Sequence, residues 1–294
     1  MNLLSLGDLL LDLLVRYDPA SGEVDVGAGA VQMHPGGSAA NFAVQAARLG
    51  AAVRFISRVG RDMPGEMLVR SLESARVTPS VRVMDGEVTG RVLVMVDDAG
   101  NRRMWSYPGA SALISPRDLE PGWFGGLDAF HLTGYSFLRE GPREAAHEAL
   151  LLARQLGSPL CTLDPNPAHL IADYGPARFR DLLGELRFDI IFPNMEEGSL
   201  LSGEHEPEAI VSSLLEISPL VVLKLGAEGC LVGTAEDRVL SPGVQVSEVV
   251  DVTGAGDAFA AAFVVEYLAR KDIRTAAAAA NHFAAQVVGR AGAR

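Results

Sequence analysis

The chain is poor in residues that several classes of protein require. It has two cysteines in 294 residues, Cys161 and Cys230. Each stands in an apolar strand-like run, so we expect buried free thiols in a reducing compartment rather than a disulfide or a metal site. The six histidines show no metal-ligand spacing. Arg102-Arg103 is the densest short basic pair and the net charge is −12, which disfavours a nucleic-acid surface.

Membrane segments and the common nucleotide motifs are missing as well. The apolar N-terminus lacks a basic region and is interrupted by Asp8 and Asp12, so we predict neither a signal peptide nor a membrane span, and a cytoplasmic protein. The sequence contains no Gly-x-x-x-x-Gly-Lys-Ser/Thr loop, no Gly-x-Gly-x-x-Gly after a strand and no Gly-x-Ser-x-Gly elbow. P-loop and dinucleotide-binding interpretations therefore lose support.

What the chain does have is a steady alternation of strand and helix patterns. The first expected strand covers residues 2–12 and ends on Asp12. The further strands are expected at 53–59, 129–133, 159–163, 189–192 and 220–225, and the helices at 39–49, 64–75, 142–156, 176–186, 207–216, 257–270 and 274–288. Repeated strand–helix units predict an α/β fold, with a mostly parallel central sheet and helices on both faces. We expect a single domain over 1–294.

Two segments depart from this alternation. Residues 13–33 mix Val and Tyr with Asp, Ser and Gly, which is typical of a short hairpin outside the main core. Residues 81–108 contain the turn signal Asp85-Gly86, an alternating run over 89–96 and a returning run over 104–107. Together the two insertions predict a small antiparallel sheet added to the main one.

Residues 251–263 are the most informative stretch. The Gly-rich loop Thr253–Gly256 leads into a helical pattern, and the start of a helix binds anions through its unpaired N–H groups. The glycines allow backbone amides to approach a phosphate closely. Asp257 places a carboxylate at this site, where it would repel a phosphate unless it takes a proton from the group that attacks it. The alternative is an ordinary role for Asp257 as a helix N-cap.

Other polar residues fall at or just after the ends of predicted strands, where ligands bind in parallel sheets. These residues are Asp12, Gly36, Gly37, Asn41, Asp164, Asn166, Asn194, Glu197, Lys224 and Gly226. Several have a purely structural alternative: Asp12 could cap a turn, and Lys224 could be a solvated strand-end charge. Asn194 is a plausible N-cap for a helix beginning at Met195, and Glu197 completes the spacing of a capping box.

Two long signatures resemble those of the ribokinase-like carbohydrate kinases, the PfkB family. The first is Gly-Gly-Ser-Ala-Ala-Asn-Phe-Ala over 36–43, and the second is Asp-Val-Thr-Gly-Ala-Gly-Asp over 251–257. Between them lie Asn-Met-Glu-Glu over 194–197, similar to the family's Asn-x-x-Glu, and Leu-Gly-Ala-Glu-Gly over 225–229, similar to its nucleotide loop. Asn281 and the Gly292-Ala293 pair also fall where the family places them. The resemblance implies a Rossmann-like three-layer α/β sandwich with a small β-sheet lid.

The resemblance also implies a role for each of these residues in transferring the γ-phosphoryl group of ATP to a sugar-type hydroxyl. Asp257 would accept the proton of that hydroxyl, and the amides of Gly254, Ala255 and Gly256 would form an anion hole. The acceptor would be held by Asp12, Gly36, Gly37 and Asn41. The nucleotide would be held by Asn194, Lys224, Gly226 and Asn281. Glu197 would organise Mg²⁺ largely through water, and Asp251 and Thr253 occupy positions that bind K⁺ in some members.

Departures from the family patterns leave the acceptor open. Ser38 stands where ribokinases usually carry Lys, Asp-Pro-Asn-Pro-Ala over 164–168 lacks the Arg of Asp-x-Asn-x-Arg, and Pro-Gly-Ala-Ser over 108–111 lacks a final Asn. We expect a small sugar or sugar acid of the ribose, fructose or 2-keto-3-deoxygluconate type. The alternatives are a nucleoside kinase of the adenosine type, a non-catalytic sugar sensor and, more remotely, a dinucleotide oxidoreductase. A homodimer through the lid is expected because an exposed sheet face and edge invite covering.

Overall fold

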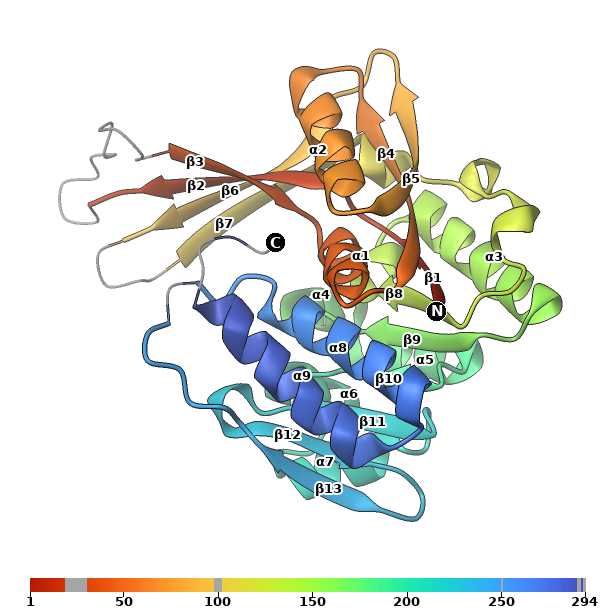
Figure 1. Cartoon of the computed structure of the whole chain (residues 1–294), viewed down its shortest axis with the longest axis vertical. Helices are drawn as coiled ribbons and strands as arrows, with labels where there is room; N and C mark the ends of the chain where they lie inside the picture. Colours follow the sequence, from red (N-terminus) through yellow and green to blue (C-terminus); the bar gives the residue numbers. More distant parts are fainter. Residues whose placement is uncertain (19–30, 98–101, 250, 290–291, 293–294) are drawn as a thin grey trace.

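The computed structural model describes residues 1–18, 31–97, 102–249, 251–289 and 292. Its main feature is a nine-stranded sheet in the order β13-β12-β11-β10-β9-β8-β1-β4-β5 (Figure 1). The strands are β1 (Asn2–Leu6), β4 (Ala52–Gly60), β5 (Val77–Met84), β8 (Ala129–Thr133), β9 (Leu160–Asp164), β10 (Ile190–Ile191), β11 (Leu220–Lys224), β12 (Gly229–Gly233) and β13 (Arg238–Pro242). All neighbours from β5 to β11 pair in parallel, whereas β12 and β13 add an antiparallel edge.

Helices cover both faces of this large sheet. They are α1 (Ser38–Arg48), α2 (Met63–Ser74), α3 (Glu140–Leu156), α4 (Ala168–Tyr174), α5 (Pro176–Leu186), α6 (Met195–Ser202), α7 (Pro207–Leu214), α8 (Ala255–Arg270) and α9 (Ile273–Val288). In Figure 1, α8 and α9 lie side by side on the face turned to the viewer, and α3 to α7 lie behind the sheet. Successive strand residues alternate between the two cores: Leu3 packs in the α1/α8/α9 core and Leu4 in the α3/α5/α7 core. The predicted α/β sandwich is confirmed.

The small sheet has the order β3-β2-β6-β7 and extends away from the large one (Figure 1). Its strands are β2 (Leu10–Arg16), β3 (Val31–Gly36), β6 (Thr89–Val96) and β7 (Arg102–Gly109). The prediction of a second sheet from the two insertions is confirmed, but the prediction that it is antiparallel throughout is wrong. β2 and β6 pair in parallel because each enters the sheet from the large one in the same direction. The middle of the first insertion, 19–30, and the turn at 98–101 lie outside the described residues.

Two predicted boundaries are wrong, and both concern the crossing between the sheets. Residues 2–12 are not one strand, because the chain leaves the large sheet after Leu6 and re-pairs from Leu10 in the small one. Gly7 sits at the break because a Cβ there would lie 2.7 Å from the Cβ of Ala39. Residues 81–84 belong to β5 of the large sheet, so the Asp85-Gly86 turn joins the two sheets and does not close a hairpin.

The hairpin of β12 and β13 was not predicted, and neither was the short helix α4. β12 begins and ends on glycine, a residue typical of turns, so its sequence did not indicate a strand. Both strands nevertheless pair over their full length. Within the described residues, no helix combines the length and apolarity needed to cross a bilayer.

Candidate active site

The loop before α8 is shaped for close approach to an anion. Gly254 is the N-cap of α8 and has a φ of 76°, a left-handed conformation that favours glycine. The helix begins at Ala255, two residues earlier than predicted. Asp257 therefore lies in the first turn and is not the N-cap, so the structural alternative for this carboxylate is wrong.

Both carboxylate oxygens of Asp257 accept hydrogen bonds from α1. Ser38 Oγ donates to Oδ1 at 2.5 Å, and Asn41 Nδ2 donates to Oδ2 at 2.8 Å. The side chain is buried where α1 packs against α8. Burial raises the pKa of Asp257 to about 6, even though the hydrogen bonds from Ser38 and Asn41 lower it. A carboxylate with this pKa is ionised at neutral pH and still basic enough to take a proton.

A buried ion pair lies beside the loop. Lys224 Nζ at the end of β11 is 2.5 Å from Asp164 Oδ2 at the end of β9. A Cβ on Gly256 would lie 3.4 Å from Lys224 Nζ, so the ammonium group is against the anion loop. Burial alone would lower the pKa of Lys224, but the charges of Asp164 and Glu197 outweigh it and raise the pKa, which keeps the side chain cationic.

Asn194 and Glu197 form the predicted capping box at the start of α6. Asn194 Oδ1 accepts from the Glu197 amide and Glu197 Oε2 accepts from the Asn194 amide, each at 2.9 Å. The backbone of Asn194 also bridges to Lys224, so α6 begins beside the ion pair. Burial raises the pKa of Glu197 to about 7; Lys224 lowers the pKa and Asp164 raises it.

The residues that could hold metals form no cage of protein ligands. Among the described residues, no three His, Cys, Asp or Glu side chains cluster as a metal site. One buried carboxylate, Glu197, nevertheless fits Mg²⁺, which keeps several waters and is usually shared with substrate phosphates. Asp251 and Thr253 do lie together: Thr253 N and Oγ1 donate to Asp251 Oδ1 at 2.9 and 2.7 Å, and Gly292 N donates to Oδ2 at 3.1 Å.

The residues predicted to hold the acceptor include three where the chain crosses between the two sheets, Asp12, Gly36 and Gly37. Asp12 lies inside β2, opposite His34, and not at the end of a strand of the large sheet. A Cβ on Gly36 would lie 2.3 Å from Asp12 Oδ2, and a Cβ on Gly37, whose φ is 100°, would lie 2.1 Å from the carbonyl oxygen of Asp8. Gly36 therefore lets the chain pass tightly over the carboxylate of Asp12, and Gly37 lets it pass tightly over the backbone of Asp8.

Two residues near this crossing were not predicted as site residues. Tyr135 follows β8, and its pKa is raised by burial and by the charges of Asp8, Asp257, Glu197 and Asp12. Burial also raises the pKa of Asp8, although a hydrogen bond from Ser111 and the charge of Arg139 lower it. The strand-end rule could have marked Tyr135, which comes two residues after Thr133.

The remaining residues predicted to hold the nucleotide, Gly226 and Asn281, lie further along the large sheet. Gly226 opens a turn after β11 with a φ of 63°. Asn281 Nδ2 donates to Ser241 Oγ, Ser241 O and Pro242 O, each at 3.1 Å, and so ties α9 to β13. Its amide nitrogen is thus engaged within the fold.

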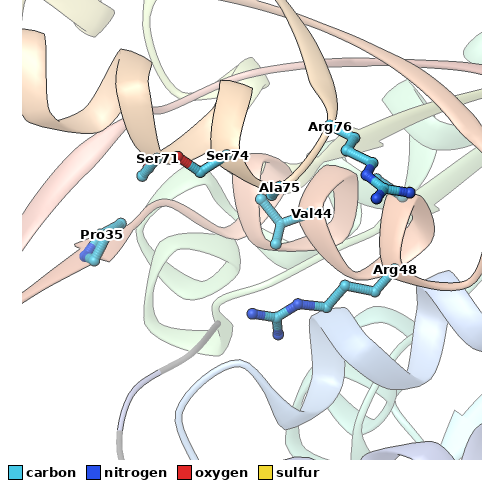
Figure 2. A pocket seen from close by; sticks show the side chains of 8 residues that line it. Pro35, Val44, Arg48, Ser71, Ser74, Ala75 and Arg76 are labelled. Atoms are coloured by element: carbon cyan, nitrogen blue, oxygen red, sulfur yellow. The ribbon is translucent and has the colours of Figure 1, made fainter.

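The larger described cavity is separate from these residues. It measures about 640 Å³ between α1 and α2 and is lined by Pro35, Val44, Ala47, Arg48, Ser71, Ser74, Ala75 and Arg76 (Figure 2). A second, of about 410 Å³, lies against α6. Asp257, Lys224 and Asp12 line neither, so the hydrogen bonds and charges identify the site better than cavity size does.

Comparison with known proteins decides the family. Residues 2–294 match the sequence profile of the pfkB family carbohydrate kinases. The chain belongs to this family. An ATP-dependent ribose-1-phosphate kinase of Halopiger xanaduensis is 31% identical, covering 100% of this chain and 94% of its own length. A 2-dehydro-3-deoxygluconokinase of Thermoproteus tenax is 34% identical, and the match covers 88% of this chain and 80% of the relative's length.

Solved structures of PfkB relatives show the same architecture. Adenosine kinase from Sinorhizobium meliloti superposes with a TM-score of 0.91 at 25% identity, covering 100% of this chain and 95% of its own. An E. coli protein assigned as ribokinase II, solved with ATP and Mg²⁺, superposes with a TM-score of 0.88 at 25% identity. The match covers 99% of this chain and 94% of the E. coli chain. The predicted ribokinase-like fold and the carbohydrate kinase class are confirmed. Ala293, part of the resemblance, lies outside the described residues.

Proposed function

We propose that this PfkB protein transfers the γ-phosphoryl group of ATP to a hydroxyl of a small sugar or sugar acid. The observation that carries the proposal is the position of Asp257, a buried carboxylate with a pKa of about 6 in the first turn after a glycine anion loop. Asn41, one of the proposed acceptor residues, donates a hydrogen bond to this carboxylate, and Lys224 lies against the loop that precedes it. A base is needed between the acceptor and nucleotide regions.

In the proposed reaction, the acceptor oxygen attacks the γ-phosphorus while Asp257 takes the proton of that hydroxyl. A new oxygen–phosphorus bond forms, the bond from the γ-phosphorus to the bridging oxygen breaks, and ADP leaves. The amides of Gly254, Ala255 and Gly256, with the helix dipole, stabilise the charge on the group in transfer. Lys224 adds a fixed positive charge against the same loop, and Asp164 holds it there.

The nucleotide and its ion occupy the edge beyond Lys224 in this proposal. Asn194, Gly226 and Asn281 line the nucleotide, and Glu197 orders Mg²⁺ through water. Mg²⁺, when bound with ATP, neutralises phosphate charge. Asp251 and Thr253 are the proposed K⁺ position, which a dependence of turnover on K⁺ over Na⁺ would test.

The acceptor side favours hydroxyl recognition. Asp12 and Asn41 offer a carboxylate and an amide, and Asp8 and Tyr135 lie close by. Carboxylates accept hydrogen bonds from hydroxyls, and they repel a carboxylate or phosphate on the acceptor. We therefore place ribose- and fructose-type sugars ahead of 2-keto-3-deoxygluconate. The structural likeness to an adenosine kinase supports a nucleoside as the second candidate.

A substrate panel tests the acceptor. Ribose, fructose, 2-keto-3-deoxygluconate, ribose 1-phosphate and adenosine are assayed side by side with ATP and Mg²⁺, and ADP release is measured. A neutral sugar should give the highest kcat/KM. Preference for adenosine would establish the second candidate, and preference for an anionic acceptor would contradict our reasoning from charge.

Asp257→Asn tests the chemistry. We expect kcat to fall by about a thousandfold, the range for loss of a general base, while the Kd for ATP stays the same. Asp181→Asn, an exposed aspartate on α5, is the matched control. Unchanged turnover in Asp257→Asn would contradict the role of Asp257 as the base. A wild-type protein that binds sugar but phosphorylates none of the panel would support the non-catalytic sugar sensor, and binding of NAD but not ATP would support the dinucleotide alternative.

We also propose a homodimer through the small sheet. Met33, Leu13, Leu93 and Trp105 stand in register across β3, β2, β6 and β7, so one face carries a continuous apolar row. Met33 is 56% and Trp105 53% exposed. An apolar face of this kind is usually covered by a partner.

A further inference from the structure

The hydrogen bonds behind Asp257 run in one direction. Asn166, which follows β9, donates from Nδ2 to Ser38 Oγ at 2.9 Å, and Ser38 Oγ lies 2.5 Å from Asp257 Oδ1. An amide nitrogen has hydrogens but no acceptor capacity, and a serine hydroxyl has one hydrogen. Because Asn166 fills an acceptor site on Ser38, the hydroxyl hydrogen of Ser38 is directed at Asp257.

The carboxylate is thereby held at both oxygens. Asn41 Nδ2 reaches Oδ2 from the next turn of α1, so the pair Ser38 and Asn41 fixes the rotation of the carboxylate plane. Asn166 Oδ1 is buried without a hydrogen-bond partner in the described structure. Leaving a buried acceptor unpaired is unfavourable, which indicates that this amide is held in place by the hydrogen bond that its nitrogen donates to Ser38.

We propose that Ser38, oriented by Asn166, is a positioning residue that fixes the carboxylate of Asp257 in the ionised, proton-accepting arrangement before the acceptor binds. This inference rests on the proposed role of Asp257 as general base. It assigns a function to the serine that replaces the usual lysine after the Gly-Gly pair, and to an asparagine outside both family signatures.

The charged groups around Asp257 explain why the arrangement needs such support. From β9, Asp164 raises the pKa of Asp257, and from β11, Lys224 lowers it; Tyr135, after β8, is the other titratable group whose pKa responds to Asp257. α1 contributes only the neutral Ser38 and Asn41 to this contact. Burial has the largest effect on the pKa of Asp257 and favours the protonated form, which cannot accept a proton. Among the interactions that lower this pKa, the hydrogen bond from Ser38 has the largest effect.

The test is the pH dependence of kcat with saturating ATP and sugar. In Ser38→Ala, the acid limb should move to higher pH by about one unit, the size of a lost hydrogen bond to a carboxylate, while the Kd for ATP is unchanged. Asn166→Ala should move the limb in the same direction by a smaller amount. Ser38→Thr keeps the hydroxyl and should keep the wild-type limb.

The outcomes separate this inference from the proposed function. If Asp257→Asn abolishes turnover but neither Ser38→Ala nor Asn166→Ala moves the acid limb, the positioning role is wrong and the base stands. If Asp257→Asn retains turnover, the proposed function itself fails. Thermal unfolding is measured for each variant; should Ser38→Ala not fold, Asn166→Ala carries the test alone, and an unmoved limb overturns the inference.

Discussion

The surroundings of Asp257 and the small sheet differ in how far their side chains find partners within a single chain. Around Asp257, hydrogen bonds from Ser38 and Asn41 hold the carboxylate, and the ammonium group of Lys224 is paired with Asp164. In the small sheet, the apolar cluster has three buried members, Leu10, Val92 and Val94, and at the two ends of the row from Met33 to Trp105 the side chains are exposed.

The difference follows from what covers each region. Asp257 is buried where α1 packs against α8, so its charge must be paired and oriented within the chain. A four-stranded sheet without helices on its outer face leaves apolar side chains in water, which favours association. We therefore expect substitutions near Asp257 to act on chemistry and folding, and substitutions in the small sheet to act on assembly.

Lys224→Met should cause the largest loss of stability. Removing one partner of a buried ion pair leaves Asp164 uncompensated, so we expect about 3 kcal/mol less stability and about a hundredfold lower kcat. Urea unfolding and steady-state turnover measure the two losses. Lys271→Met, an exposed lysine at the end of α8, is the control.

The double variant Lys224→Met with Asp164→Asn then separates charge pairing from catalysis. It should recover most of the stability, because residue 164 no longer carries a buried charge without its partner, but not the turnover. Recovery of turnover would show that Lys224 serves the fold and not the phosphoryl group.

Trp105→Glu should convert the dimer to a monomer. A charge placed in the apolar row would have to be desolvated at the interface, which disfavours association. Sedimentation velocity at micromolar concentration measures the change. Leu240→Glu, at an exposed leucine on β13, should leave the assembly intact. A wild-type protein that sediments as a monomer would contradict the proposed homodimer.

Asp257→Asn should stabilise the protein at pH 8 by about 3 kcal/mol while it lowers kcat by about a thousandfold. The pKa of Asp257 is about 6 when folded and 3.8 as the reference value, so the unfolded chain releases its proton first as pH rises. The free energy of unfolding of the wild type therefore decreases as the pH rises from about 3.8 to about 6, whereas that of the variant does not. Urea unfolding at pH 8 and at pH 3.5 checks the sign: an equal difference at both would contradict it.

Gly36→Ala tests the place where the two regions meet, with the smallest expected effect. The new methyl group would push the Asp12 carboxylate aside, since all three nearest atoms belong to that side chain. We expect KM for the sugar to rise about tenfold with kcat nearly unchanged, the pattern for lost ground-state binding. Gly122→Ala, which has open space around its Cβ position, is the control.

The sequence predicts these regions unequally for physical reasons. Local signatures placed Asn41 and Asp257 in one site although 216 residues separate them. The break at Gly7 was missed because leucines stand on both sides of Gly7-Asp8, and burial in two sheets leaves the same leucine-rich pattern as burial in one. The contact of Lys224 with Asp164 depends on strand order, which periodicity does not encode; the strand-end rule placed both at one edge but not as a pair.

The two cysteines have a practical consequence. Cys161 and Cys230 are 1% and 0% exposed, and burial raises the pKa of their thiols to about 11 and 12. The thiolate is the reactive form, so the native chain should not react with maleimide at neutral pH. A single Arg103→Cys substitution on β7 would then carry a fluorophore without further engineering, and its emission would report in real time how the small sheet responds to sugar and ATP.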